Sequence, residues 1–453
     1  MQSILSNNQL DYVLFHLEQH VDLGTLKKQI VYGTNLKSEI IFYSSDKEIN
    51  EITQLEYKNK TIPILFPQAD SQSFYTFEDG KLIFHHDLLK SAFYLLSGYQ
   101  ETLPSVSDAM GRFQYKSSIQ YRLGIVEVPL VNYYFEIIIE GLEKYAAYHG
   151  LTIKRKRLFD DFGFMLTHDV DRVDYYHWRE TVLKIMQILG LKPSDYADKK
   201  QLFKATLDAI LPTLFPGYKK DPWWNFDELR QIEKQLDIKS TWYFLNRDGS
   251  PHDAKYILEE DRIKKQIYKL IGQKCEVGLH GSIKTADSLS DLQKAKDRLQ
   301  KLTSIEVVGT RQHFLKLHYP STLVNQQACG LKYDSTLGFA EHEGFRNSYC
   351  YPFHPYDFEN DKMMAIWEFP LVIMDTTLYG YRNLINKEIL QASDVIIEEI
   401  KRFGGLLVLL WHNCNFNEYQ YPGIENIYKE LLRQIMDKKA SSVVGADVLT
   451  MLD

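Results

Sequence analysis

Two aspartates that are two residues apart follow an apolar run in the segment Thr167–Asp171, which reads Thr-His-Asp-Val-Asp. In an extended segment, side chains two positions apart point the same way. Asp169 and Asp171 would therefore repel each other unless a cation or a proton lies between them. A divalent metal resolves this conflict, because it takes one carboxylate as a ligand and leaves the other beside a water as a base. The alternative is a solvent-facing loop whose acids cap a helix near Arg172.

Three histidines also stand where apolar runs end. His280 follows Gly278 and Leu279, His313 closes the run from Gly309, and His412 follows Trp411. Neutral imidazole is a good ligand for zinc and similar ions. A histidine with a pKa near neutrality can also protonate a leaving group. For each histidine alone, a packed side chain bonded to a backbone carbonyl is the simpler interpretation.

Arg311 lies two positions before His313, so both side chains are expected on one side of an extended segment. A guanidinium can hold a carboxylate in a fixed orientation. Arg311 is therefore a candidate partner for Asp169, while His313 is a candidate metal ligand. The alternative is a surface salt bridge beside a buried histidine.

The elements that must position these residues alternate between strands and helices from about residue 156 onward. The expected strands are Gly163–His168, Ile238–Leu245, Glu276–His280, Val307–Phe314, Leu331–Leu337, Ala365–Met374 and Gly405–His412. The expected helices are Phe226–Leu236, Asp261–Ile271, Leu289–Leu302, Lys387–Phe403 and Asn426–Lys438. This alternation predicts parallel strands with crossover helices, and about seven such units favour a barrel over an open sheet. The carboxyl ends of barrel strands meet at one face, so we expect the polar residues there to share one pocket.

This constellation resembles the polysaccharide deacetylases, carbohydrate esterase family 4, from about Phe164 to the C-terminus. The resemblance implies an α/β fold with a distorted (β/α)7-type barrel and a divalent metal held by an aspartate and two histidines. Zinc is the first expectation, with other divalent ions as alternatives. The resemblance further implies that Asp169 is the catalytic base, that Arg311 holds it, and that His412 is the acid.

The chain departs from the family pattern at two metal-ligand positions. The family motif Thr-Phe-Asp-Asp-Gly has Val170 in place of its second aspartate here, so Asp171 must supply the carboxylate. In the motif His-Ser-x-x-His, His280 matches the first histidine, but Lys284 stands at the second. His313 is the candidate replacement on reach and chemistry. The expected metal ligands are thus Asp171, His280 and His313.

Residues 1–155 are expected to form a smaller α/β domain of unknown role before the barrel domain of residues 156–453. Helices are expected at Leu10–Glu18, His86–Leu96 and Tyr133–Tyr148, strands at Glu39–Tyr43 and Thr61–Phe66, and a loop at Asp108–Phe113. The region also resembles the domain attached to such barrels, for which no firm activity is implied. Between Tyr175 and Asp221 the pattern predicts an insertion with some helical content.

The composition and net charge limit the classes of partner that the protein is expected to bind. A net charge of −7 and a pI of about 6.1 argue against nucleic acid and anionic-membrane surfaces in general. Met1–His20 lacks a signal-peptide pattern, and the longest apolar stretches are too short for a transmembrane segment. We therefore expect a cytoplasmic protein that acts on a carbohydrate or another sugar-containing small molecule. Nothing in the sequence predicts the oligomeric state.

The leading hypothesis is a metal-dependent amide hydrolase that deacetylates an N-acetylated sugar or a polysaccharide precursor. Two alternatives stay open. The same barrel and metal could hydrolyse a non-sugar amide or an ester. The departures at Val170 and Lys284 could instead mark a degenerate site on a carbohydrate-binding or scaffolding protein.

Overall fold

Strand β9 (Phe162–Val170) is buried along its whole length and lies inside the largest sheet of the computed structural model. The structure describes residues 4–34, 37–49, 51–68, 71–194, 196, 198–250 and 253–453. Around β9 the strand order is β16-β13-β12-β11-β10-β9-β18-β17, and every neighbouring pair is parallel. The other strands are β10 (Ser240–Leu245), β11 (Glu276–Gly281), β12 (Gly309–Gln312), β13 (Tyr333–Asp334), β16 (Trp367–Glu368), β17 (Leu371–Met374) and β18 (Leu406–Leu410). A short strand, β19 (Ala440–Ser442), also pairs with β9.

The two ends of this strand order are consecutive in the chain. Only Phe369 and Pro370 separate β16 from β17, and this passage carries the chain from the β13 side of the sheet to the β18 side. The amide of Phe369 donates to the carbonyl of Asp334, and that of Leu371 donates to the carbonyl of Leu337. The two edge strands are therefore consecutive in the chain without pairing with each other, and the expected α/β fold with a parallel, barrel-type sheet is confirmed.

Amphipathic helices cover this sheet because each crossover buries its apolar stripe against the strands. They are α7 (Phe226–Gln235), α8 (Asp261–Gly272), α9 (Leu289–Thr303), α10 (Ser321–Ala328), α11 (Asn386–Phe403), α12 (Ile424–Asp437) and α13 (Gly445–Leu452). Their ends follow local chemistry: the Ser288 hydroxyl accepts from the Asp291 amide at the start of α9. Gly404 ends α11 in the left-handed conformation, at φ 73°.

Several expected strands are shorter than their sequence patterns: Leu331–Leu337 contains only β13, and Ala365–Met374 is divided into β16 and β17. The run Val307–Phe314 was expected as a strand, but β12 ends at Gln312 and a turn occupies His313–Leu315. Phe314 and Leu315 have φ values of 60° and 53°, which no strand residue adopts. This turn is what directs His313 away from the strand.

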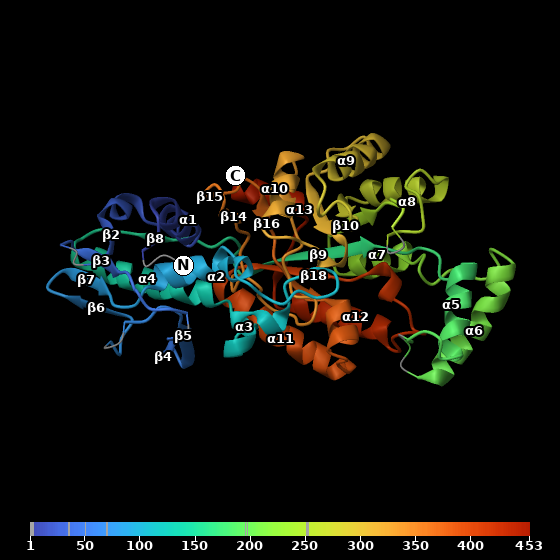
Figure 1. Cartoon of the computed structure of the whole chain (residues 1–453), viewed down its shortest axis with the longest axis horizontal. Coiled ribbons are helices and arrows are strands. Elements are labelled where there is room, and N and C mark those ends of the chain that lie inside the picture. Colours follow the sequence, from blue (N-terminus) through green and yellow to red (C-terminus); the bar gives the residue numbers. More distant parts are fainter. Residues whose placement is uncertain are drawn as a thin grey trace.

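The N-terminal region carries a four-stranded sheet of order β2-β3-β7-β6 and a hairpin of β4 and β5. The elements are α1 (Asn7–Leu17), β2 (Ile30–Gly33), β3 (Ile40–Tyr43), β4 (Thr53–Tyr57), β5 (Lys60–Ile64), β6 (Tyr75–Glu78), β7 (Lys81–Phe84), α2 (Leu88–Leu96) and α4 (Leu130–Tyr148). This region lies at one end of the elongated molecule, as Figure 1 shows. The mixed α/β content agrees with expectation, whereas the domain boundary at 155 stays a prediction.

The N-terminal region and the barrel share buried polar contacts. The Tyr12 hydroxyl donates to the carbonyl of His354 at 2.8 Å, and both side chains lie in the interior. Arg346 forms two hydrogen bonds with the Glu101 carboxylate, at 2.8 and 2.7 Å. Separating the two parts would leave these buried polar groups without partners, which is unfavourable. The N-terminal region and the barrel are therefore packed together.

The insertion expected between Tyr175 and Asp221 is a helical hairpin. It consists of α5 (Trp178–Ile188) and α6 (Lys199–Leu214). Figure 1 shows the pair projecting at the end of the molecule opposite to the N-terminal region.

Candidate active site

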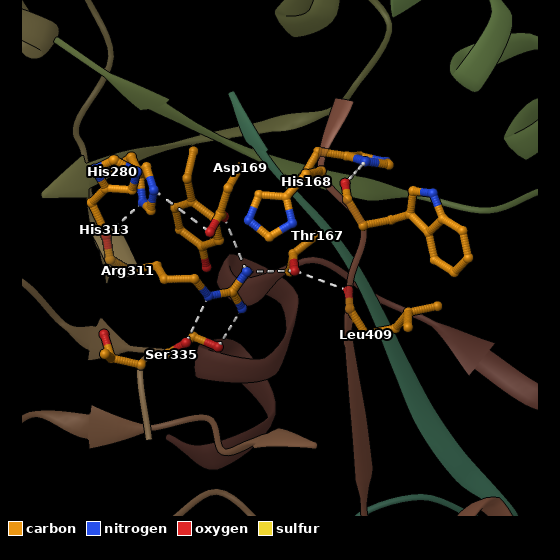
Figure 2. A network of polar contacts seen from close by, with 12 residues as sticks. Thr167, His168, Asp169, His280, Arg311, His313, Ser335 and Leu409 are labelled. Atoms are coloured by element: carbon orange, nitrogen blue, oxygen red, sulfur yellow. Dashed lines mark hydrogen bonds and ion pairs between the residues drawn. The ribbon is translucent and has the colours of Figure 1, made fainter. Parts of the chain in front are cut away.

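The polar residues expected at the strand ends lie together at the carboxyl face of the sheet. Figure 2 shows Asp169, His280 and Arg311 lying close together, with His313, from the turn after β12, beside His280. The strand register explains this, because Tyr243 pairs with Asp169, and His280 pairs with Arg311. The structure thus brings residues that are far apart in sequence close together.

Asp171, His280 and His313 form a group whose potential ligand atoms all lie within 4.8 Å of one another. Nε2 of His280 is 3.2 Å from Oδ1 of Asp171, and Nε2 of His313 is 3.6 Å from its Oδ2. One carboxylate and two imidazoles are a donor set that suits zinc and similar divalent ions. Lys284 lies apart from this group, since its ammonium donates to the carbonyl of Asp248 at 3.0 Å.

The ring orientation of His280 leaves one nitrogen for a cation. Its Nδ1 lies 2.9 Å from the carbonyl oxygen of Arg311, which can only accept, so Nδ1 carries the proton. In the neutral ring, Nε2 then presents a lone pair to Oδ1 of Asp171. Both atoms are buried and have no hydrogen-bond partner among the described residues. Two facing lone pairs repel unless a cation or proton lies between them, so these residues fit a divalent metal.

The charge of Asp171 agrees with this role, whereas His313 would have to lose its proton to a bound cation. Burial alone raises the pKa of Asp171, but His313 and His280 outweigh burial and hold it well below its usual range. Burial lowers the pKa of His313, whereas the Asp171 carboxylate raises it to about 9. Asp171 is therefore ionised at neutral pH, as a metal ligand must be.

Arg311 fixes the second carboxylate. This side chain is fully buried, and its Nη1 donates to Oδ1 of Asp169 at 3.2 Å and to the Thr167 hydroxyl at 2.7 Å. Ser335 accepts two further hydrogen bonds from Arg311, with its carbonyl bonded to Nε at 2.7 Å and its hydroxyl to Nη2 at 2.9 Å (Figure 2). The guanidinium also lies over the Tyr243 ring, 4.8 Å from the centroid. Arg311 is therefore rigid, and it holds Asp169 beside the group of Asp171, His280 and His313.

His412 lies on the other side of the group of Asp171, His280 and His313. Its Nδ1 donates to Oδ1 of Asp375 at 2.7 Å, and its Nε2 lies 3.8 Å from Oδ2 of Asp171. Asp375 is itself fixed, because it accepts from the His412 amide at 2.8 Å and from Asn415 at 3.1 Å. Burial alone lowers the pKa of His412, but Asp375 outweighs burial and raises it to about 9. A protonated His412 at neutral pH can act as a general acid.

Asp169, Asp171, His313 and His412 line a cleft of about 970 Å³. Aromatic side chains occupy much of its remaining wall, among them Trp223, Tyr379, Tyr381 and Tyr421. Flat aromatic faces suit the apolar faces of sugar rings, and tyrosine adds a hydroxyl for polar contact. The cleft is therefore large enough and suitably lined for a sugar substrate.

One residue of the N-terminal region reaches this cleft. Arg112 donates from Nη1 to the Phe314 carbonyl at 2.8 Å and from Nη2 to the Tyr381 hydroxyl at 3.1 Å. Asp108 holds the guanidinium through Nε at 2.6 Å. Arg112 thereby ties the N-terminal region to the turn that carries His313. The sequence predicted residues 108–113 as a loop, correctly, but assigned no role to Arg112.

Sequence reasoning also assigned no role to Asp375, although a signal for it existed. Asp375 follows the apolar run Leu371–Met374, the same strand-end position that identified the other site residues.

Two residues adjacent in sequence to the site residues lie in the core. Trp411 is fully buried and packs against Tyr428, with ring centroids 5.0 Å apart, so it fills the barrel rather than contacting a ligand. His168 is bonded through both ring nitrogens, to the Trp411 carbonyl and to Glu233.

Comparisons with known proteins were made for the whole chain. Residues 5–147 match a family of unknown function (DUF7033). No curated protein matches the chain. Among solved structures, a protein from Mycobacterium smegmatis described as a polysaccharide deacetylase is 13% identical, with a TM-score of 0.41, over 64% of this chain and 90% of that one.

Two further solved structures have similar values. An allantoinase is 11% identical with a TM-score of 0.41, over 63% of this chain and 89% of that one. A carbohydrate esterase family 4 pseudoenzyme from Bacillus anthracis is 11% identical with a TM-score of 0.32, over 64% of this chain and 66% of that one. At these identities and TM-scores, function has to be argued from the side chains of the site.

Proposed function

We propose that this protein is a metal-dependent amide hydrolase that removes the acetyl group from an N-acetylated sugar. The proposal depends on where the group of Asp171, His280 and His313 lies. This group stands between two side chains that are each fixed in place by a buried partner. Asp169 and its partner Arg311 lie on one side, and His412 and its partner Asp375 lie on the other. A degenerate site has no need of a base and an acid that are each fixed by a buried partner.

Asp171, His280 and His313 would hold the cation. When bound, a divalent ion supplies Lewis-acid polarisation of a carbonyl oxygen and makes water a better nucleophile near neutral pH. Asp169 would accept the proton of the attacking water, with Arg311 keeping the carboxylate in place. His412 would donate the proton on Nε2 to the leaving nitrogen as the carbon–nitrogen bond breaks.

The expected substrate is an acetylated amino sugar, and the aromatic cleft wall and the volume of about 970 Å³ support it. Zinc remains the first candidate metal. A non-sugar amide or an ester remains the alternative substrate, because the side chains of the site would act on the bond and not on the group attached to it.

Acetate release from N-acetylglucosamine oligomers, nucleotide-linked N-acetyl sugars and simple acetamides tests the proposal. We expect release from one of the two sugar classes, and a loss of about a hundredfold or more in Asp169→Asn. Asp174→Asn is the matched control, because Asp174 pairs with Arg262 on the surface, with Oδ1 and Nη1 2.6 Å apart. If Asp169→Asn keeps full activity, the assignment of the base is wrong. Acetamide turnover without sugar turnover would favour the non-sugar alternative.

A further inference from the structure

The helical hairpin of α5 and α6 presents its apolar residues to solvent. One exposed apolar stripe on α5 and its C-cap consists of Trp178, Val182, Ile185, Met186 and Leu189, and one on α6 consists of Phe203, Leu207, Ile210, Leu211 and Leu214. Both sets follow the spacing i, i+4, i+7, i+8 and i+11, which places each set on one face of its helix. These ten side chains are between 39% and 65% exposed.

A surface helix of a globular protein normally turns such a stripe toward the core. Here the faces turned inward carry mostly small or polar residues: Thr181 and Lys184 on α5, and Leu202, Ala205, Thr206, Ala209 and Pro212 on α6. The Thr181 and Thr213 hydroxyls are 2.7 Å apart and hydrogen-bond between the helices. The segment from Trp178 to Tyr218 holds 14 of the 29 large apolar side chains that are exposed among the described residues. A concentration of this kind marks an interaction surface.

The charge of the hairpin identifies the kind of partner. Residues 178–220 contain eight lysines and arginines against four acidic residues, whereas the whole chain has 53 against 60. Lys192, Lys199, Lys200 and Lys204 are all exposed. Aromatic residues accompany them, since Trp178, Phe203, Phe215 and Tyr218 are among the exposed side chains. Basic, apolar and aromatic residues together are the composition of helices that lie in the surface of an anionic bilayer.

We infer that the α5–α6 hairpin is a docking surface for an anionic lipid bilayer. Among the described helices, none has the length and apolarity required to span a membrane. The hairpin helices, of 11 and 16 residues, would instead lie in the interface, with their apolar stripes among the lipids and their lysines against the headgroups. Charge favours this partner over pairing with the hairpin of a second copy, because that hairpin would present the same excess of lysines and arginines.

The hairpin contributes to the wall of the cleft. Tyr196, in the segment that joins the two helices, lines the cleft, and its hydroxyl lies 2.6 Å from that of Tyr175. The Tyr419 hydroxyl donates to Asp208 of α6 at 2.9 Å, just before Gln420 and Tyr421 of the cleft wall. Docking would therefore bring the cleft to sugars carried on lipids. This consequence rests on the proposed function, whereas vesicle binding does not.

Vesicle cosedimentation of the full chain, without substrate or added metal, tests the docking surface. Vesicles of phosphatidylcholine alone would be compared with vesicles that also contain phosphatidylglycerol. We expect binding to the anionic vesicles, and binding weaker by about tenfold or more in the variant Leu207→Ser with Leu211→Ser. Reversing Lys199, Lys200 and Lys204 to glutamate should remove the preference for phosphatidylglycerol.

The matched control is Val324→Ser with Val395→Ser, which alters two exposed valines on α10 and α11. It should bind vesicles as the unmodified protein does. Because all the altered side chains are exposed, circular dichroism and thermal unfolding should match in every variant. The inference is overturned if the unmodified protein ignores both kinds of vesicle, or if the leucine variant binds unchanged. It is also overturned if sedimentation shows a dimer that the leucine substitutions dissociate, since a second copy then covers the hairpin. Hydrolysis without vesicle binding would reject the docking surface alone.

Discussion

The imidazole of His412 is held by Asp375, whose Oδ1 accepts from Nδ1 at 2.7 Å. This bond turns Nε2 of His412 toward Asp171, at 3.8 Å, and into the cleft. Asp375 is fully buried, and Asn415 and the His412 amide fix its second oxygen. An acid that is charged and oriented by a buried carboxylate is a recurring device of hydrolytic sites.

Replacing Asp375 with asparagine should lower the pKa of His412 from about 9. The asparagine oxygen can still accept from Nδ1, but the negative charge that opposes burial is gone. The fraction of protonated His412 at neutral pH therefore falls, and hydrolysis should slow by about a hundredfold. NMR titration of the His412 ring in the metal-free protein measures the shift directly. Asn415→Ala serves as the control, because it removes one donor to Asp375 and leaves the charge. An unchanged titration in Asp375→Asn would contradict the assignment.

Arg112 is expected to act as a positioning residue for His313. Its bond to the Phe314 carbonyl holds a turn whose φ values are positive at Phe314 and Leu315. Loss of that bond in Arg112→Ala should weaken zinc binding by about tenfold, as measured by competition with a chelator. Arg122→Ala is the matched control, since this arginine of the same region bonds instead to the Ile49 carbonyl. Equal zinc affinity in both variants would mean that Arg112 only packs against the barrel.

The stability of the protein should fall as the pH drops below the ordinary histidine pKa, in part because of His16. Its Nδ1 donates to the Tyr12 carbonyl at 2.8 Å, and its Nε2 accepts from the His354 amide at 3.1 Å. Burial lowers the pKa of His16 from 6.5 to about 3. Between these values the unfolded chain binds the extra proton, so acid favours unfolding by about 1.4 kcal/mol per pH unit.

Urea unfolding at several pH values measures this slope. In His16→Gln, the free energy of unfolding should depend less steeply on pH below 6.5, because the unfolded chain binds one proton fewer. His318→Gln is a suitable control, because the His318 side chain is 43% exposed. Identical slopes in the unmodified protein and in His16→Gln would show that His16 does not contribute.

The sequence predicted the barrel well because the evidence for it is local. Apolar runs bounded by helical patterns mark each strand, and the carboxyl ends of parallel strands must meet. Asp169, Asp171, His280, Arg311 and His412 could be grouped from that rule alone. The same rule grouped His313 with them, but its assignment as a metal ligand required an argument from chemistry. Its position depends on a turn with positive φ that the sequence pattern does not predict.

Other features depend on packing that no local pattern encodes. Arg112 reaches the cleft only because the N-terminal region packs against the barrel more than two hundred residues further along the chain. The α5–α6 hairpin was expected only as an insertion with helical content. Its helical periodicity indicates an apolar face, but not that the face is turned away from the core. Asp375 is different, because its strand-end position was visible in the sequence and was not used.

Metal content of the purified protein is the most direct test of the central claim. After supply of zinc, the unmodified chain should carry about one divalent ion, as measured by mass spectrometry. His280→Ala and Asp171→Ala should each lose it, whereas Lys284→Ala should keep it because that side chain bonds to the Asp248 carbonyl. Absence of a bound ion in the unmodified protein, after zinc, nickel or cobalt is supplied, would contradict the account.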